Sequence, residues 1–290
     1  MNRILRVAGL SLLAVLMVAG FCTQFVGAQA SGQKTFTSSE EALNAFVSAV
    51  RSGNTSEIIA ILGPESEPIV NSGDTVADEK ARASFVASYD AGHSLVAGEG
   101  GLVLQIGKNR WPMPIPLVHS GDKWYWDGAA GKEEVLYRRI GHDEIDAINV
   151  CHGVIAAQHD YAASGHDGQP AGAFAKRIVS TPGKQDGLYW EAKEGESDSP
   201  AGPMLAGATE EGYDISGNRV PYHGYYYRLL PVSSGFVLVA YPAQYRSSGV
   251  MTFVANDKGL VYEKDLGQDT TKTALAMSSF TADKTWRKVK

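Results

Sequence analysis

The most regular pattern in the sequence lies between residues 143 and 162, where apolar positions recur at intervals of three and four. This spacing places the side chains on one face of an α-helix. The predicted stripe consists of Ile145, Ile148, His152, Ile155, His159 and Ala162, and a second row broadens it, consisting of Ala147, Cys151, Val154, Gln158 and Tyr161. A helix with so wide an apolar face must pack on a sheet or on other helices. The rest of the chain has to supply that partner.

The C-terminal part of the chain predicts a sheet for this helix. Short apolar segments at residues 225–230, 236–241, 251–255 and 260–265 have strand composition, and the Asn-Asp-Lys-Gly sequence at 256–259 is typical of a hairpin turn. A short helix is expected at 270–280. Residues 164–221 are rich in Gly, Pro, Ser and acidic residues, which predicts an irregular region with helical turns near 174–178 and 204–209.

The N-terminal part predicts helices followed by a hairpin. Residues 38–41 have the spacing of a capping box, and apolar residues at 43, 46, 47 and 50 share one helical face that ends at Gly53. Further helices are expected at 55–62 and 78–89, and strands at 102–107 and 123–127. Pro112, Pro114 and Pro116 restrict the intervening segment to an edge strand or an extended stretch, because proline lacks the N–H of a central strand. The predicted fold class is therefore α+β.

Small residues at 128–131 suggest a break between the two parts. The predicted division is a signal peptide at 1–30, an N-terminal subdomain at 31–130 and a C-terminal subdomain at 131–290. The signal peptide is predicted from Arg3 and Arg6, the uncharged apolar stretch at 7–20, and an A-x-A cleavage site that ends at Ala30. We therefore expect a periplasmic or secreted protein with no membrane span after cleavage.

Charge and motif content exclude several function classes. The chain has 26 Lys and Arg against 32 Asp and Glu, for a net charge of −6, and so lacks the basic excess of a nucleic-acid binder. It contains no P-loop, no G-x-S-x-G elbow and no dinucleotide fingerprint. His152 and His159 lie two helical turns apart, too far to share one zinc ion. We therefore expect no cofactor, no metal and no catalytic residue.

The remaining candidates are binding residues. Aromatic side chains concentrate at Trp190 and in the segment 221–227, which includes Tyr222, His223 and Tyr225. Asp186 and Glu191 flank the Leu-Tyr-Trp sequence at 188–190. A pair of carboxylates beside aromatic rings could act as the catalytic pair of a glycosidase. Packing of the same rings in the sheet is the competing interpretation. Arg138 and Arg139 could bind a ligand, cap a helix or pair with acidic residues.

Several segments together carry a family resemblance. They are R-R-I-G at 138–141, residues 157–161, S-T-P-G-K-Q-D-G-L-Y-W at 180–190, residues 199–203, P-Y-H-G-Y-Y-Y at 221–227, and residues 249–256 and 261–267. This set resembles DUF2950, a family of secreted bacterial proteins to which no activity is attached. The resemblance implies Asn where this chain has Asp143, and a Gly-rich insertion where residues 231–234 connect two strands directly.

The C-terminal half also resembles the globular heads of type IV pilin-like proteins, in which one amphipathic helix covers an antiparallel meander. This resemblance implies the fold, because the chain lacks the apolar stalk that assembles pilin filaments. The N-terminal half is faintly similar to cystatin-like or NTF2-like domains. Two hypotheses for function follow: a non-enzymatic protein-protein interaction module of the envelope, or a binder or hydrolase of glycan or peptidoglycan that uses an aromatic groove.

Overall fold

The computed structural model describes residues 30–192, 198–214 and 220–290. Its N-terminal half begins with helices: α1 (Ser39–Arg51), α2 (Thr55–Leu62), a 3₁₀ turn (Pro64–Ser66), α3 (Glu67–Val70) and α4 (Thr75–Ala91). An antiparallel sheet follows, in the order β1-β2-β4-β5 with β3 also paired to β2. Its strands are β1 (His93–Gly98), β2 (Gly101–Ile106), β3 (Trp111–Pro112), β4 (Leu117–Ser120) and β5 (Lys123–Trp126). The sequence pattern did not predict four of these elements, namely the 3₁₀ turn, α3, β1 and β4.

The N-terminal core forms where α1 and α2 meet β5. Helix α1 is capped as predicted, because the Ser38 hydroxyl accepts a hydrogen bond from the Glu41 N–H at 3.1 Å. The apolar face of α1 is buried. It packs around Trp126, whose indole N–H donates to the Ala42 carbonyl at 3.1 Å. The predicted amphipathic face therefore positions the helix on the hairpin.

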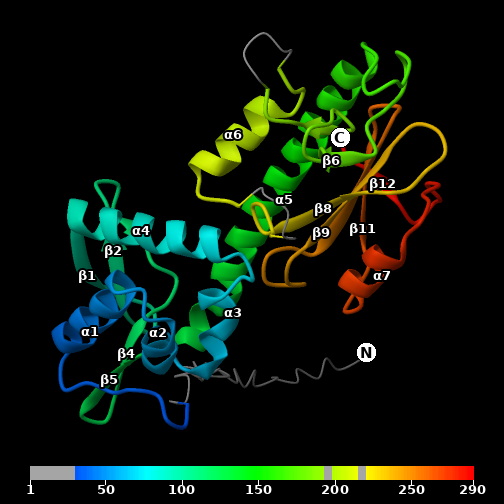
Figure 1. Cartoon of the computed structure of the whole chain (residues 1–290). Coiled ribbons are helices and arrows are strands. Elements are labelled where there is room, and N and C mark those ends of the chain that lie inside the picture. The colour runs from blue at the N-terminus through cyan, green and yellow to red at the C-terminus, as the bar shows by residue number, and fades with distance from the viewer. Residues whose placement is uncertain (1–29, 193–197, 215–219) are drawn as a thin grey trace, which may run out of the picture.

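Helix α5 (Gly128–Ala162) is much longer than predicted, and it crosses both halves of the molecule (Figure 1). Its 35 residues include the small residues that suggested a break. Asp127 caps the first turn by accepting from the Ala130 N–H at 3.0 Å. Gly128 and Gly131 permit close approach, because a Cβ at Gly131 would lie 2.7 Å from the Pro114 carbonyl oxygen. These glycines mark a tight helix contact, and the division at residue 130 stays a prediction.

The C-terminal half is the predicted helix on a meander. Its sheet has the order β12-β11-β10-β9-β8, with all neighbours antiparallel. The strands are β8 (Tyr225–Leu229), β9 (Val237–Pro242), β10 (Met251–Asn256), β11 (Val261–Asp265) and β12 (Arg287–Lys288). Alternate side chains of β9 and β10 pack beneath α5 on one face and toward α7 (Thr270–Ala276) on the other. The α+β architecture is therefore as predicted, with β12 in addition.

The face that α5 buries differs from the predicted central stripe. Ala147, Cys151, Val154, Gln158 and Tyr161 are buried, and together they form the row that was expected only to broaden the stripe. Of the predicted stripe, Ile155 is buried and Ile148 packs against the core, but Ile145 is 61% exposed, and His152 and His159 are also exposed. Both rows have helical spacing. The C-terminal sheet packs against the row that has small side chains at positions 147 and 151. The periodicity thus identified the helix but assigned its centre to the wrong row.

A decorated region connects α5 to the C-terminal sheet. Strands β6 (Arg177–Val179) and β7 (Gly187–Tyr189) pair in parallel, and α6 (Gly202–Glu210) follows. The predicted helical turn at 174–178 is wrong, because residues 174–176 are irregular and residues 177–179 form β6, after which the Ser180 N–H donates to the Tyr189 carbonyl at 2.8 Å. The helix predicted at 204–209 is present as α6.

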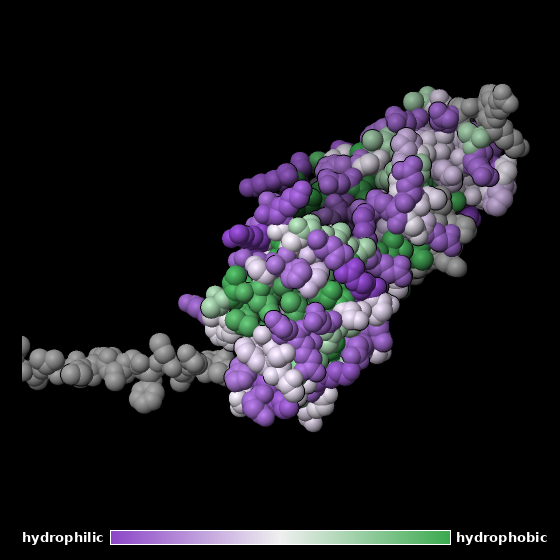
Figure 2. Space-filling model, turned by 90° about the vertical axis from the view of Figure 1, so that its left-hand side faces the viewer, coloured by the Kyte–Doolittle hydropathy of each residue, from purple (hydrophilic) through white to green (hydrophobic). Residues whose placement is uncertain are grey.

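No helix in the described ranges combines the length and the apolar character that a membrane crossing requires. The face shown in Figure 2 is mostly hydrophilic, and its hydrophobic side chains gather in separate patches. The predicted signal peptide falls almost wholly on residues 1–29, outside the described residues.

Candidate functional site

The aromatic residues predicted to form a groove divide between the core and the surface. Trp190 is 7% exposed and Tyr225 is fully buried, and both belong to the core beneath α5. The Tyr225 hydroxyl donates to the Met251 carbonyl at 2.9 Å, which satisfies it inside the fold. Tyr222 is half-buried and lies against Tyr213 with ring centroids 4.9 Å apart. A groove that exposes Trp190, Tyr222 and Tyr225 together is therefore not formed.

His223 lies where α5 and the segment after α6 meet. Its Nδ1 lies 2.8 Å from the Asp146 carboxylate and its Nε2 lies 3.0 Å from the Glu211 carboxylate. Glu211 also accepts from Lys80 of α4 at 3.0 Å. Burial alone would raise the pKa of Glu211, but the hydrogen bonds and charges of Lys80 and His223 outweigh it and lower that pKa.

Asp74 connects the two halves from the N-cap of α4. Its carboxylate accepts from the Tyr213 hydroxyl at 3.1 Å and from the Gly224 N–H at 2.9 Å. Gly224 has φ +75°, and a Cβ there would lie 2.5 Å from a carboxylate oxygen of Asp143. Glycine is therefore required where β8 begins. The Asp74 carboxylate thus holds together segments that lie about 140 to 150 residues apart in the chain.

Asp143 is a buried carboxyl beside that junction. Burial raises the pKa of Asp143 to about 8, the Arg139 guanidinium partly offsets this, and the neighbouring carboxylates of Asp74, Asp146 and Asp78 raise it further. The group is therefore largely protonated at neutral pH.

The two predicted arginines have structural partners. Arg139 donates to the carbonyls of Pro68 and Ile69 at the end of α3, the first at 2.8 Å. Burial lowers the pKa of Arg139. Arg138 pairs with Glu134 at 2.6 Å on the helix surface and lies 4.5 Å above the Trp111 ring. Arg139 thus caps a helix, one of the roles predicted for it.

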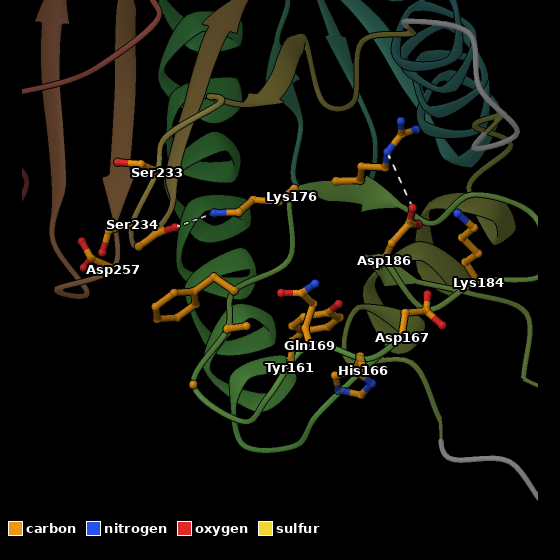
Figure 3. Close-up of a pocket in the computed structure, with 15 residues that line it drawn as sticks. Tyr161, His166, Asp167, Gln169, Lys176, Lys184, Asp186, Ser233, Ser234 and Asp257 are labelled. Atoms are coloured by element: carbon orange, nitrogen blue, oxygen red, sulfur yellow. Dashed lines mark hydrogen bonds and ion pairs between the residues drawn. The ribbon is translucent and has the colours of Figure 1, made fainter.

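Asp186 lines a polar cavity of about 690 Å³ (Figure 3). Its carboxylate accepts from the Thr181 N–H at 2.7 Å and hydroxyl at 2.8 Å, and it lies 4.0 Å from Arg177. Burial would raise the pKa of Asp186, but these donors outweigh it and lower that pKa. Glu191, the second predicted carboxylate, is exposed and does not line this cavity.

An apolar groove of about 590 Å³ shares Arg177 with this cavity and is lined by residues of α5, β6, α6 and the edge strand β8. Its walls include Val179 and Val220, which are 37% and 43% exposed. Four tyrosines line it as well: Tyr213, Tyr222, Tyr226 and Tyr227. Of the predicted site residues, only Tyr222 lines this groove. The groove combines segments from residue 150 to residue 228, so no local sequence pattern could have identified it.

The described residues contain no group of His, Cys, Asp and Glu side chains arranged to hold a metal ion. Cys151 is fully buried, and burial raises the pKa of its thiol to about 12.

A family model described as "Protein of unknown function (DUF2950)" matches residues 33–234 and 231–289. The two matches overlap at 231–234, where the family resemblance implies a Gly-rich insertion and this chain connects two strands directly. No curated protein and no solved structure matches the chain. The similarity of the C-terminal half to pilin heads therefore stays a prediction.

Proposed function

The chain belongs to the DUF2950 family, whose description gives no function, and we propose that it is a binding protein that holds a partner polypeptide. The proposed binding site is the apolar groove between α5, α6, β6 and β8. The partner segment is extended, with apolar side chains that enter the groove and an acidic side chain at its β6 end.

The composition of the groove is the observation that carries the proposal. Four tyrosines, one methionine and two arginines line it, and lysine and glutamate are absent from its described walls. Tyrosine, methionine and arginine are enriched at protein interfaces, whereas lysine and glutamate are depleted there. Val179 and Val220 add exposed aliphatic surface, which a bound segment would remove from water.

Charge favours an acidic partner segment. The side chain of Arg177 is 63% exposed, and its one ion pair among the described residues is the 4.0 Å contact with Asp186, so its guanidinium is accessible at the end of the groove. Arg228 is held by carbonyls at the end of α7, the nearest at 2.7 Å. Asp214 is the one acidic residue among the described walls. This local positive balance contrasts with the net charge of −6 for the whole chain.

Selection from a library of phage-displayed random dodecapeptides tests the proposal. We expect enriched sequences that combine aliphatic or aromatic residues with Asp or Glu, and calorimetry should confirm binding of the synthetic peptide. Val179→Asp and Val220→Asp should each weaken that binding at least about tenfold. Leu275→Asp is the matched control, because Leu275 is 39% exposed on α7 and outside the groove.

Three results would overturn this assignment. They are the failure of any peptide to be enriched, binding that both groove variants leave unchanged, and a dimer that dissociates in the Val179→Asp variant. The last result would assign the groove to a second copy of the chain.

Export is the second part of the proposal. The predicted signal peptide and its cleavage after Ala30 support it. Secretion of the full precursor, followed by N-terminal sequencing of the product, should give a chain that begins at Ser31. A product in the cytoplasm that retains Arg3 and Arg6 would contradict export.

A further inference from the structure

We propose that the polar cavity around Asp186 is a second binding site, which takes a neutral, hydroxyl-rich saccharide. Among the described residues, this cavity and the apolar groove share only Arg177 of β6. This inference does not depend on the polypeptide partner proposed above.

The cavity is balanced in charge. Three cationic side chains and three carboxylates line it: Lys176, Arg177, Lys184, Asp167, Asp186 and Asp257. A site for a densely charged anion would need an excess of cations, and a site for an apolar ligand would lack most of these groups. Saccharide hydroxyls suit such a lining, because each can donate to a carboxylate and accept from an ammonium group.

Some of these six charged side chains already have partners within the protein, and others are free to contact a ligand. Asp186 is engaged by Thr181, and the Lys176 ammonium donates to the carbonyls of Val232 and Gly235 at 3.2 and 3.4 Å. The side chains of Lys184 and Asp257 make no hydrogen bond or ion pair with any residue that the structure describes. They remain available to a ligand.

The available groups lie on opposite sides of the cavity. Figure 3 shows Lys184 beside Asp186 on one side, and Asp257 with Ser233 and Ser234 on the other. A ligand that reached both would span the cavity, and the Gln169 amide lies between them. The cavity volume of about 690 Å³ falls within the range of about 300–1,000 Å³ typical of small-molecule sites.

A packed aromatic group supports one wall. The Tyr161 ring stacks on the His166 ring with centroids 4.2 Å apart, and the Trp190 ring lies 5.3 Å behind His166. Tyr161 is anchored by its hydroxyl, which donates to the Gln185 carbonyl at 2.8 Å. Trp190 therefore supports the wall from the core, and the half-buried Phe174 contributes a ring to the cavity itself.

Binding of the purified protein to an array of oligosaccharides, with heparin included as a densely anionic glycan, tests this inference. We expect binding to at least one neutral oligosaccharide and no preference for heparin. Calorimetry with that oligosaccharide should then show at least about tenfold weaker binding for Lys184→Ala and for Asp257→Ala.

Lys258→Ala is the control, because Lys258 is exposed on the same turn as Asp257 but does not line the cavity. Melting temperatures should match across the variants, since these side chains lie on the surface. The Val179→Asp variant should retain saccharide binding, which separates a failure of this site from a failure of the groove.

Four outcomes would overturn the inference: no array member bound, only heparin bound, binding unchanged in both cavity variants, or binding lost equally in Lys258→Ala.

Discussion

The buried carboxyl of Asp143 gives the sharpest test of the junction between the two halves. Its pKa is about 8 in the folded protein, against an ordinary value of 3.8. Between these values the unfolded chain loses the proton while the folded chain keeps it. The free energy of unfolding therefore falls as pH rises, by about 1.4 kcal/mol per pH unit. This loss begins near pH 4 and levels off above about pH 8.

Asp143→Asn removes this pH dependence, because an amide does not ionise. We expect the difference in unfolding free energy, variant minus wild type, to rise by up to about 4 kcal/mol between pH 4 and pH 7. An unpaired amide N–H costs about 1–3 kcal/mol at every pH. The variant should thus be the less stable protein at pH 4 and the more stable one at pH 7, by roughly 1–3 kcal/mol. Asparagine is also the residue that the family resemblance leads us to expect here.

Urea unfolding, followed by tryptophan fluorescence at pH 4, 5, 6 and 7, measures this difference. Asp160→Asn is the control, because Asp160 is an exposed carboxylate near the other end of the same helix. Its difference from wild type should change little over this range. A constant difference for Asp143→Asn from pH 4 to pH 7 would refute the reasoning, because it would mean that Asp143 is ionised in the folded state.

Three further predictions concern packing, each measured by urea unfolding at one pH. Trp126→Ala should cost about 3–5 kcal/mol, because the indole is fully buried in the N-terminal core; a cost below about 1 kcal/mol would contradict that packing. Gly131→Ala should destabilise by about 1–3 kcal/mol through its clash with Pro114, whereas Gly141→Ala, with open space around it, should stabilise by roughly 0.5–1 kcal/mol. Equal effects at the two glycines would rule out the close helix contact. Ile145→Glu should change the free energy of unfolding by no more than about 0.5 kcal/mol, because Ile145 is 61% exposed. A larger loss would mean that Ile145 is buried, as the predicted stripe requires.

Local patterns predicted much of the secondary structure. Helix α2 has the predicted bounds, and α1 buries the predicted face after its predicted cap. The strands β8–β11 lie within a residue or two of their predicted positions. These successes share a cause, since periodicity, caps and turn residues act over a few neighbouring positions.

The candidate sites were less accessible to sequence reasoning. Asp186 was identified by its position beside aromatic residues, and it does line a cavity. Trp190 and Tyr225 were identified by the same clustering, yet both are buried in the core. Clustering of aromatic residues shows only that their rings are close in the sequence. Whether a ring is buried depends on which face of its strand packs against α5. The apolar groove and the polar cavity around Asp186 each combine distant segments, so only the folded chain reveals them.

The sequence by itself determined many of the helices and strands, and which side chains share a face of each of them. It could not determine that α5 begins at Gly128, because a glycine in the sequence signals a break as readily as a close contact. It could not choose between the two rows of α5, since both have helical spacing. Those choices belong to the tertiary structure, where the Pro114 carbonyl leaves no room for a Cβ at Gly131 and the C-terminal sheet packs against Ala147 and Cys151.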